Sequence, residues 1–92
     1  MKIGQIVIVK KGRDKGRMMV VLAVEPGKTA EATFLTLADG KARTLSKPKK
    51  KKAMHVQPTN SYADLTRAGP RGLQDADIRK MLGEEVHPVG EG

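Results

Sequence analysis

The residues with the clearest chemical potential form a short basic segment near the N-terminus. Five cationic side chains fall within eight positions and are opposed only by Asp14: Lys10, Lys11, Arg13, Lys15 and Arg17. Gly12 and Gly16 lack side chains, so the backbone at both could approach a phosphate group closely. The Gly-x-x-x-x-Gly-Lys-Ser/Thr spacing of a nucleotide-binding P-loop is missing, and the segment instead predicts contacts with the phosphates of a polyanion. The alternative is a solvated turn in which Asp14 neutralises a neighbour or caps the turn.

A second basic segment follows Pro48 and contains four consecutive lysines, Lys49, Lys50, Lys51 and Lys52, with Lys47 just before the proline. Proline stiffens the start of this segment, and repulsion between adjacent lysines predicts an extended, mobile chain. Laid along a duplex or a folded RNA, such a chain could neutralise several phosphates and become ordered. The alternative is a solubilising loop between two strands.

Positive charge is concentrated in the first part of the chain. The 92 residues carry a formal net charge of +8, from 18 Lys and Arg against 10 Asp and Glu. Residues 1–56 contain 14 basic and 4 acidic residues, whereas residues 57–92 contain 4 basic and 6 acidic residues. This separation indicates that the first part meets a polyanion. The alternative is that the charge serves only solubility, but such charge would be spread more evenly.

Several kinds of chemistry find no support in the sequence. Cysteine is absent, which excludes disulfides, thiolate catalysis and cysteine-ligated metal sites. His55 and His87 lie 32 positions apart, Ser46 and Ser61 have no recognisable nucleophile setting, and neither an HExxH motif nor a paired-carboxylate spacing occurs. We therefore expect a protein that is not an enzyme and that has no catalytic residue, metal or cofactor.

Aromatic residues are too few to form a platform that stacks single-stranded bases. Phe34 and Tyr62 are the only two, and strand alternation predicts that Phe34 lies in the core. Recognition is therefore expected to depend on phosphates, sugar hydroxyls and the shape of an RNA. The planar guanidinium groups of Arg13, Arg17 and Arg43 are the best candidates for stacked or bidentate contacts.

Apolar periodicity predicts a small sheet. The expected strands are residues 5–9, 18–24, 33–37, 42–45 and 54–57. Residues 10–17 form the turn of the first hairpin, Asp39-Gly40 forms a two-residue turn, and Pro58 ends the fifth strand. Four or five short strands at this spacing are typical of a small, strongly twisted barrel.

The first strand is apolar on both faces, because Val7 and Val9 point to one side and Ile6 and Ile8 to the other. A barrel has a single interior, so part of its outer surface needs a cover. The predicted cover is a helix capped by Asp75. Ile78, Met81 and Leu82 form its apolar face, and Leu73 joins them from just before the cap. The predicted organisation is a barrel over residues 1–58, a helical extension over 59–82, with an additional helical turn over 61–67, and a flexible tail over 83–92.

The glycines and valines of the hairpin have a spacing that resembles the KOW motif of several ribosomal proteins and transcription elongation factors. The matching residues are Gly4, Val7, Val9, Gly12, Lys15, Gly16, Val21 and Val24, with Gly16 at the nearly obligatory glycine. Met19 stands where many KOW sequences carry a second glycine. Three further segments resemble large-subunit ribosomal protein fourteen of archaea and eukaryotes: Leu37-Ala38-Asp39-Gly40, Arg43 and His55-Val56-Gln57-Pro58. Over residues 3–82 the chain is similar to the short KOW-domain RNA-binding proteins of Gram-positive bacteria, and this resemblance implies an SH3-like barrel that associates with RNA.

Charge and resemblance together predict an RNA-binding protein, a ribosomal or ribosome-associated component that docks on folded ribosomal RNA or another structured RNA and contacts ribosomal proteins. The predicted RNA-binding residues are Lys10, Lys11, Arg13, Lys15, Gly16, Arg17, Arg43, Lys47, Lys49, Lys50, Lys51 and Lys52. The other interpretation is a protein-interaction module whose barrel edge and helix over residues 75–82 bind the transcription or translation machinery. We expect a monomer when free. The sequence shows neither a signal peptide nor a membrane-spanning run, which predicts a cytoplasmic protein without membrane contact.

Overall fold

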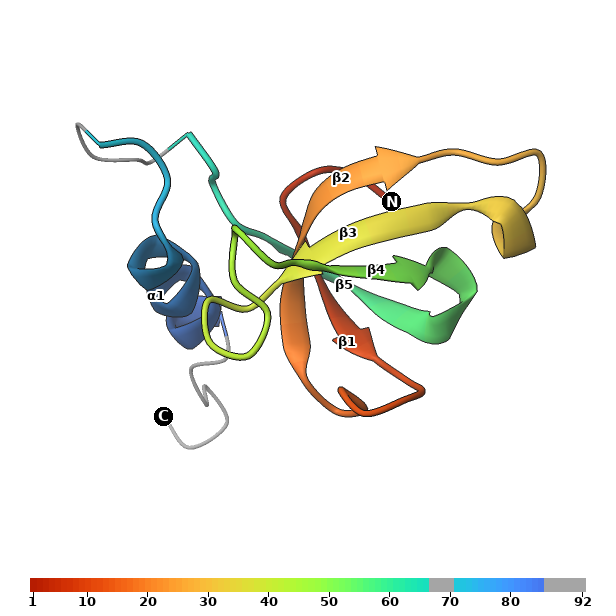
Figure 1. Ribbon diagram of the computed structural model, residues 1–92, viewed down its shortest axis with the longest axis horizontal. Coiled ribbons are helices and arrows are strands. Elements are labelled where there is room, and N and C mark those ends of the chain that lie inside the picture. Colours follow the sequence, from red (N-terminus) through yellow and green to blue (C-terminus); the bar gives the residue numbers. More distant parts are fainter. Residues whose placement is uncertain (67–70, 86–92) are drawn as a thin grey trace.

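Five antiparallel strands and a C-terminal helix make up the part of the chain that the computed structural model describes, residues 1–66 and 71–85 (Figure 1). In chain order the elements are β1 (Gln5–Val9), β2 (Met18–Glu25), the 3-10 helix η1 (Ala30–Ala32), β3 (Phe34–Ala38), β4 (Lys49–Lys52), the 3-10 helix η2 (Ala53–His55), β5 (Val56–Tyr62) and α1 (Asp75–Glu85). The strands lie in the order β4-β3-β2-β1-β5. The prediction of a mainly β fold with a C-terminal helix is confirmed. The sheet is open, because β4 and β5 form its two edges and do not pair with each other.

The predicted first hairpin forms, with β1 and β2 antiparallel and Val7 opposite Met19. The basic loop (residues 10–17) connects the two strands. Gly12 has φ +91° and Gly16 has φ +89°, a region of backbone space that L side chains rarely adopt. The loop therefore needs glycine at both positions because of their backbone conformation.

Side chains alternate along the strands and form two hydrophobic clusters on opposite faces. The strand cluster consists of Val7, Val9, Met19, Val21, Leu35, Leu37 and Val56. The helix cluster joins strand residues to α1 and consists of Ile6, Val20, Ala63, Ile78, Met81 and Leu82. Helix α1 stands beside the strands in Figure 1 and covers this second apolar face. The predicted cover is confirmed for Ile6, which is fully buried, but Ile8 is only half-buried and belongs to neither cluster.

The fourth strand differs from the prediction. Residues 42–45 do not form a strand; they belong to a loop over residues 39–48, and the lysine run that was expected to be a mobile chain forms β4 instead. The backbone groups of the loop are satisfied outside any ladder, because the carbonyl oxygen of Arg43 accepts hydrogen bonds from the N–H groups of Asp39 and Gly40. The N–H of Leu45 donates to Asp75 Oδ1 at 2.8 Å.

The fifth strand also differs, because β5 begins at Val56 and continues through Pro58 to Tyr62. Pro58 lies opposite Val7 in an edge strand, where a residue without a backbone N–H is tolerated. The helical turn predicted over residues 61–67 is wrong for Ser61 and Tyr62, which belong to β5, and Arg67 lies outside the described residues.

The predicted helix is confirmed, and it extends to Glu85. Asp75 has a different role from the predicted cap, since its carboxylate holds the 39–48 loop through Leu45. At the start of the helix, Asp77 Oδ2 accepts a hydrogen bond from the N–H of Gln74. Of the predicted tail, residues 86–92 lie outside the described residues. Within residues 1–66 and 71–85, no helix has both the length and the apolar character needed to cross a bilayer.

Replacing Ile78 by alanine tests whether α1 is an integral part of this fold. Ile78 is fully buried in the helix cluster, so the variant should lose about 2–4 kcal/mol of unfolding free energy through lost burial and an unfilled cavity. Urea unfolding followed by circular dichroism measures the loss. Lys80→Ala on the exposed face of the same helix is the control and should change stability by less than about 0.5 kcal/mol. Equal stability of the two variants would show that α1 does not hold the sheet.

Candidate nucleic-acid interface

Two basic segments that are about 40 residues apart in sequence meet at one corner of the sheet. The N–H of Lys10 donates to the carbonyl oxygen of His55 at 2.9 Å, which attaches the basic loop to η2. A Cβ on Gly12 would lie 2.6 Å from Lys51 Nζ, so the ammonium group of Lys51 packs directly on the loop backbone. The basic loop and β4 therefore form one continuous surface, which we call the basic corner (residues 10–17 and 49–52).

The pKa of His55 is lowered by burial and by the positive charges of the basic corner. Burial, followed by the charges of Lys11, Lys51, Lys52 and Lys10, lowers the pKa of His55 from its ordinary value of 6.5. The ring is therefore neutral at physiological pH. Because lysines of both segments act on the same ring, their charges are close enough to repel one another.

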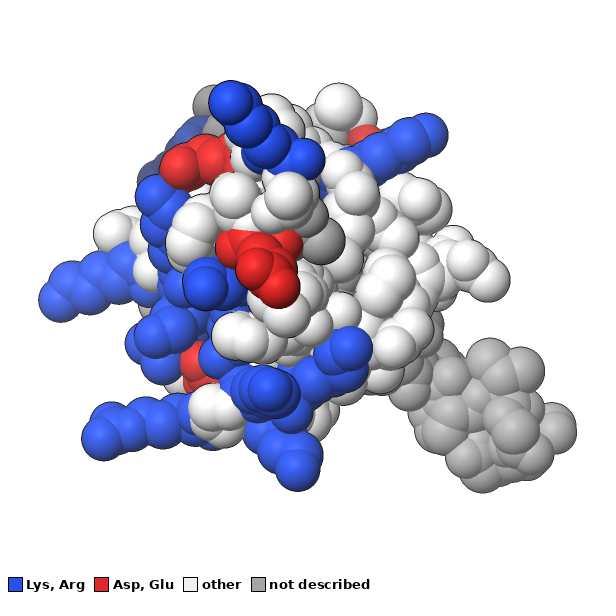
Figure 2. Space-filling view, turned by 90° about the vertical axis from the view of Figure 1, so that its right-hand side faces the viewer, with Lys and Arg blue, Asp and Glu red and all other residues white. Residues whose placement is uncertain are grey.

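Positive charge is also one-sided on a larger scale. In Figure 2, Lys and Arg side chains gather mainly on the left and lower parts of the molecule and also project at the top and upper right, whereas the middle of the right-hand side is white. In the basic loop, four exposed cations have no ion-pair partner among the described residues: Lys10, Lys11, Arg13 and Lys15. These side chains keep their full charge toward solvent.

The lysines of β4 alternate between two faces of the sheet. Lys49 and Lys51 lie opposite Leu37 and Leu35 of β3, so they share the face of the strand cluster and are half-buried. Their aliphatic stems can cover apolar side chains while the ammonium groups reach the surface. The strand is stable despite its charge because β3 supplies backbone pairing for all four lysines.

Lys50 differs from the other lysines of β4, because its charge is already engaged. Lys50 Nζ lies 2.9 Å from Glu25 Oε1 and 5.5 Å above the centre of the Phe34 ring. Phe34 is therefore half-buried under a cation, and the prediction that it lies in the core is wrong. Among the lysines of β4, Lys50 therefore has the least charge to offer a ligand.

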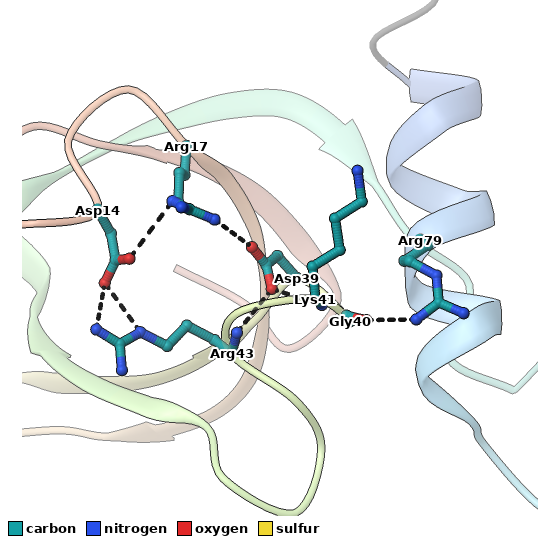
Figure 3. Close-up of polar contacts among 7 residues, drawn as sticks. All are labelled: Asp14, Arg17, Asp39, Gly40, Lys41, Arg43 and Arg79. Atoms are coloured by element: carbon teal, nitrogen blue, oxygen red, sulfur yellow. Dashed lines mark hydrogen bonds and ion pairs between the residues drawn. The ribbon is translucent and has the colours of Figure 1, made fainter.

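Arg17 and Arg43, which were predicted to contact RNA, have partners inside the protein (Figure 3). Arg43 Nε and Nη2 lie 3.0 and 2.9 Å from Asp14 Oδ2. Arg17 Nε lies 3.5 Å from Asp14 Oδ1, and its Nη1 lies 3.4 Å from Asp39 Oδ2. Both carboxylates are buried, and this four-residue network ties the basic loop to the 39–48 loop. The two arginines position the surface, and their capacity for bidentate contacts is spent largely within the protein.

Asp39 is the centre of this network. Its Oδ1 accepts hydrogen bonds from the N–H groups of Lys41 and Arg43, each at 2.9 Å. Burial acts to raise the pKa of Asp39, but these two hydrogen bonds and the guanidinium of Arg17 outweigh it and lower the pKa below 3.8. Asp39 is therefore ionised at neutral pH and acts only as an acceptor.

The remaining predicted residues lie at the edges of the basic corner. Lys47 is exposed in the 39–48 loop, and its N–H is held by Thr44 in a local turn, so the structure does not bring it into the network. Gly16 donates its N–H to Val9 and closes the basic loop, and a Cβ there would meet no atom within 4 Å. The requirement for glycine at this position therefore comes from its φ angle.

Sequence reasoning missed the role of Asp39, which was interpreted only as part of a turn, and the position of His55 between the basic segments. One signal was available for the carboxylates: residues 1–56 contain only four acidic residues, and two of them, Asp14 and Asp39, are buried. No protein-family model and no curated protein matches the chain. The functional argument therefore depends on the basic corner and on the network beneath it.

Replacing Gly16 by alanine tests the backbone requirement of the loop. The variant changes no charge, and the added methyl group would contact no atom within 4 Å. The expected loss of about 1–2 kcal/mol of unfolding free energy therefore comes from the positive φ alone. Thermal and urea unfolding measure it. Gly83→Ala in α1, where φ is not positive, is the matched control and should stabilise the protein by about 0.5–1 kcal/mol. A loss of the same size in both variants would contradict the assignment.

Acid unfolding tests the contribution of Asp39. Its pKa is lowered in the folded state, so the folded protein binds fewer protons than the unfolded chain, and the stability that Asp39 supplies is lost as the pH falls below 3.8. Asp39→Asn should destabilise the protein by about 1–3 kcal/mol at neutral pH and show a smaller further loss in acid. Urea unfolding at several pH values between about 6 and 2.5 measures both effects. Glu31→Gln, an equal charge change at an exposed residue, should keep the wild-type profile, and an unchanged profile for Asp39→Asn would contradict the prediction.

Proposed function

We propose that this protein binds structured RNA through the basic corner, as a ribosomal or ribosome-associated component that docks on folded ribosomal RNA. The observation that carries the proposal is the meeting of the basic loop with β4 at η2, which concentrates cations from two distant segments. The repulsion among these cations is offset only in part by Asp14, Asp39 and Glu25. A row of phosphates would relieve the remainder and release the counterions that the phosphates hold.

The distribution of aromatic residues favours recognition of phosphates and RNA shape over base stacking. Phe34 lies beneath Lys50, and Tyr62 is exposed alone on β5. A single-strand platform needs several exposed rings side by side. Folded RNA with closely spaced phosphates is therefore the partner that best fits a rigid cationic corner.

The finer assignment of the fold, an SH3-like barrel of the KOW type, belongs to the same proposal. Two features support it. Three residues of η2 connect the edge strands β4 and β5, and the residue at the KOW glycine position, Gly16, has φ +89°. The residue pattern that resembles KOW proteins thus lies on a β-hairpin whose motif glycine has a positive φ, which supports the proposal.

The proposal is tested by binding to a ribosomal RNA fragment and by cosedimentation with ribosomal subunits at moderate and high salt. With about six cations on phosphates, log K should fall with log salt with a slope of roughly −4 to −5. A slope near −1 would contradict RNA docking and favour the alternative, a protein-interaction module of the translation or transcription machinery.

Two neighbouring lysines provide a matched pair of variants. Lys51→Ala removes a cation without a carboxylate partner in the basic corner and should weaken RNA binding several-fold while reducing the salt slope by about one unit. Lys50→Ala removes a cation that Glu25 already neutralises and should have a clearly smaller effect on both. Fluorescence anisotropy across a salt series measures the difference. No effect of either variant would show that the basic corner is not the binding surface, whereas equal weakening by both would show that Glu25 does not neutralise Lys50.

A further inference from the structure

A pocket of about 300 Å³ lies between the start of β2, the 39–48 loop and the end of α1. Its apolar surface includes the side chains of Met18 and Leu82, and three cationic residues line it as well: Arg17, Lys41 and Arg79. Arg17 is the last residue of the basic loop, so the pocket continues directly from the basic corner. The volume is at the lower end of the range for small-ligand sites.

The walls of this pocket are held in place without a ligand. Arg79 Nη1 donates to the carbonyl oxygen of Gly40 at 2.5 Å, which ties α1 to the loop (Figure 3). Asp75 of α1 binds the N–H of Leu45 in the same loop. A Cβ on Gly40 would collide with the backbone carbonyl of Asp75, so the loop and the helix are in close contact. Such pre-ordered walls reduce the entropy lost on binding.

Among the described lining residues, one carries a negative charge, the carboxylate of Asp39. Its Oδ1 accepts from two backbone N–H groups, whereas Arg17, at the long distance of 3.4 Å, is the one described residue that contacts its Oδ2. Oδ2 therefore keeps acceptor capacity for a ligand that carries N–H donors. A phosphate would be repelled by Asp39, and a protein lysine or arginine side chain would be repelled by the three cations around it.

A ligand that fits all these features has a flat body with apolar faces, N–H donors on its edge and a phosphate attached. We propose that the pocket is a subsite for one unpaired guanosine of the RNA, with the base on the apolar wall to which Met18 and Leu82 contribute and its phosphate beside Lys41 and Arg79. This proposal rests on the function proposed above, because it places an extrahelical nucleotide next to the RNA surface. Unpaired bases in RNA are commonly read in this way, by apolar or guanidinium contacts to the face and hydrogen bonds to the edge.

The carboxylate of Asp39 favours guanine over the other bases, because guanine presents two adjacent donors, N1–H and N2–H, on its Watson–Crick edge. Because Oδ1 of Asp39 already accepts two backbone N–H groups, both donors of guanine would meet the single oxygen Oδ2 in a three-centre contact. Adenine and cytosine have a single amino group beside an acceptor on the same edge, and that acceptor would face the carboxylate unfavourably. A correct paired contact of this kind discriminates between bases by roughly 1–3 kcal/mol, which is about fivefold or more in affinity.

The test uses two RNA hairpins that differ only in one bulged nucleotide, guanosine or adenosine. Wild-type protein should bind the bulged-guanosine hairpin at least about fivefold more tightly, with the same salt slope for both. Gly83→Leu is the blocking variant, since Gly83 lines the pocket and a Cβ there meets no atom within 4 Å. It keeps the charge and favours the helix, and it should remove the preference while leaving binding of the adenosine hairpin unchanged. Ala76→Leu on the exposed part of α1 is the control and should keep the preference.

A titration with free guanosine 5′-monophosphate, followed by amide NMR, locates the subsite separately from RNA docking. Shifts at Met18, Lys41 and Leu82 that Gly83→Leu removes would support it. Equal, strongly salt-dependent binding of the two hairpins, or a preference that survives Gly83→Leu, would overturn the subsite and leave the proposed function standing. Failure of both hairpins to bind would overturn the proposed function. The titration with guanosine 5′-monophosphate would then show by itself whether the pocket binds a nucleotide.

Discussion

Four side chains, Asp14, Arg17, Asp39 and Arg43, form a network that joins the basic loop to the 39–48 loop. The two carboxylates are buried, so they act in a medium where charge–charge attraction is stronger than in water. They need cationic partners to be buried at all. This constraint explains why two arginines are directed inward while the neighbouring lysines remain free. The buried carboxylates of Asp14 and Asp39 neutralise part of the charge of the basic corner from inside the protein, which reduces the repulsion among its cations.

Strand β4 shows how one sequence feature serves both the fold and the surface. Four adjacent lysines would repel one another in a free chain, yet backbone pairing with β3 holds them at fixed spacing. Alternation then gives the lysines different environments. Lys51 approaches the backbone of the basic loop, whereas Lys50 is neutralised by Glu25 above the ring of Phe34. A charge run that is uniform in sequence is therefore uneven in its capacity to bind phosphate.

Helix α1 connects the packing of the core with the shape of the surface. Ile78 completes the helix cluster against Ile6 and Val20, and this burial fixes where the helix lies. The polar side of the same helix then reaches the 39–48 loop through Asp75 and Arg79. The pocket beside Asp39 exists because these contacts hold loop and helix a fixed distance apart. A change that loosens the helix would be expected to alter the surface as well as the stability.

Local pattern was sufficient for much of this protein. The hairpin of β1 and β2, the glycines of the basic loop and the need of Ile6 for a cover all follow from side-chain alternation and from the φ angles that tight turns require. The helix from Asp75 follows from helical periodicity, although its extension to Glu85 does not. The concentration of positive charge in residues 1–56 is a property of composition, and it indicates a polyanionic partner without any knowledge of the fold.

Tertiary structure decided which of the charged residues are available, because pairing depends on partners that are distant in sequence. Arg43 binds Asp14 across 29 positions, and Arg17 binds Asp39 across 22, so neither arginine is as free as its local sequence indicates. The strand character of the lysine run and the passage of β5 through Pro58 depend in the same way on β3 and on β1. Asp39 looked like a turn residue in the sequence, and it became the centre of a network only where the loop, the hairpin and the helix meet. Local propensity depends only on the residues within one segment, whereas burial and ion pairing depend on contacts between segments that are distant in sequence.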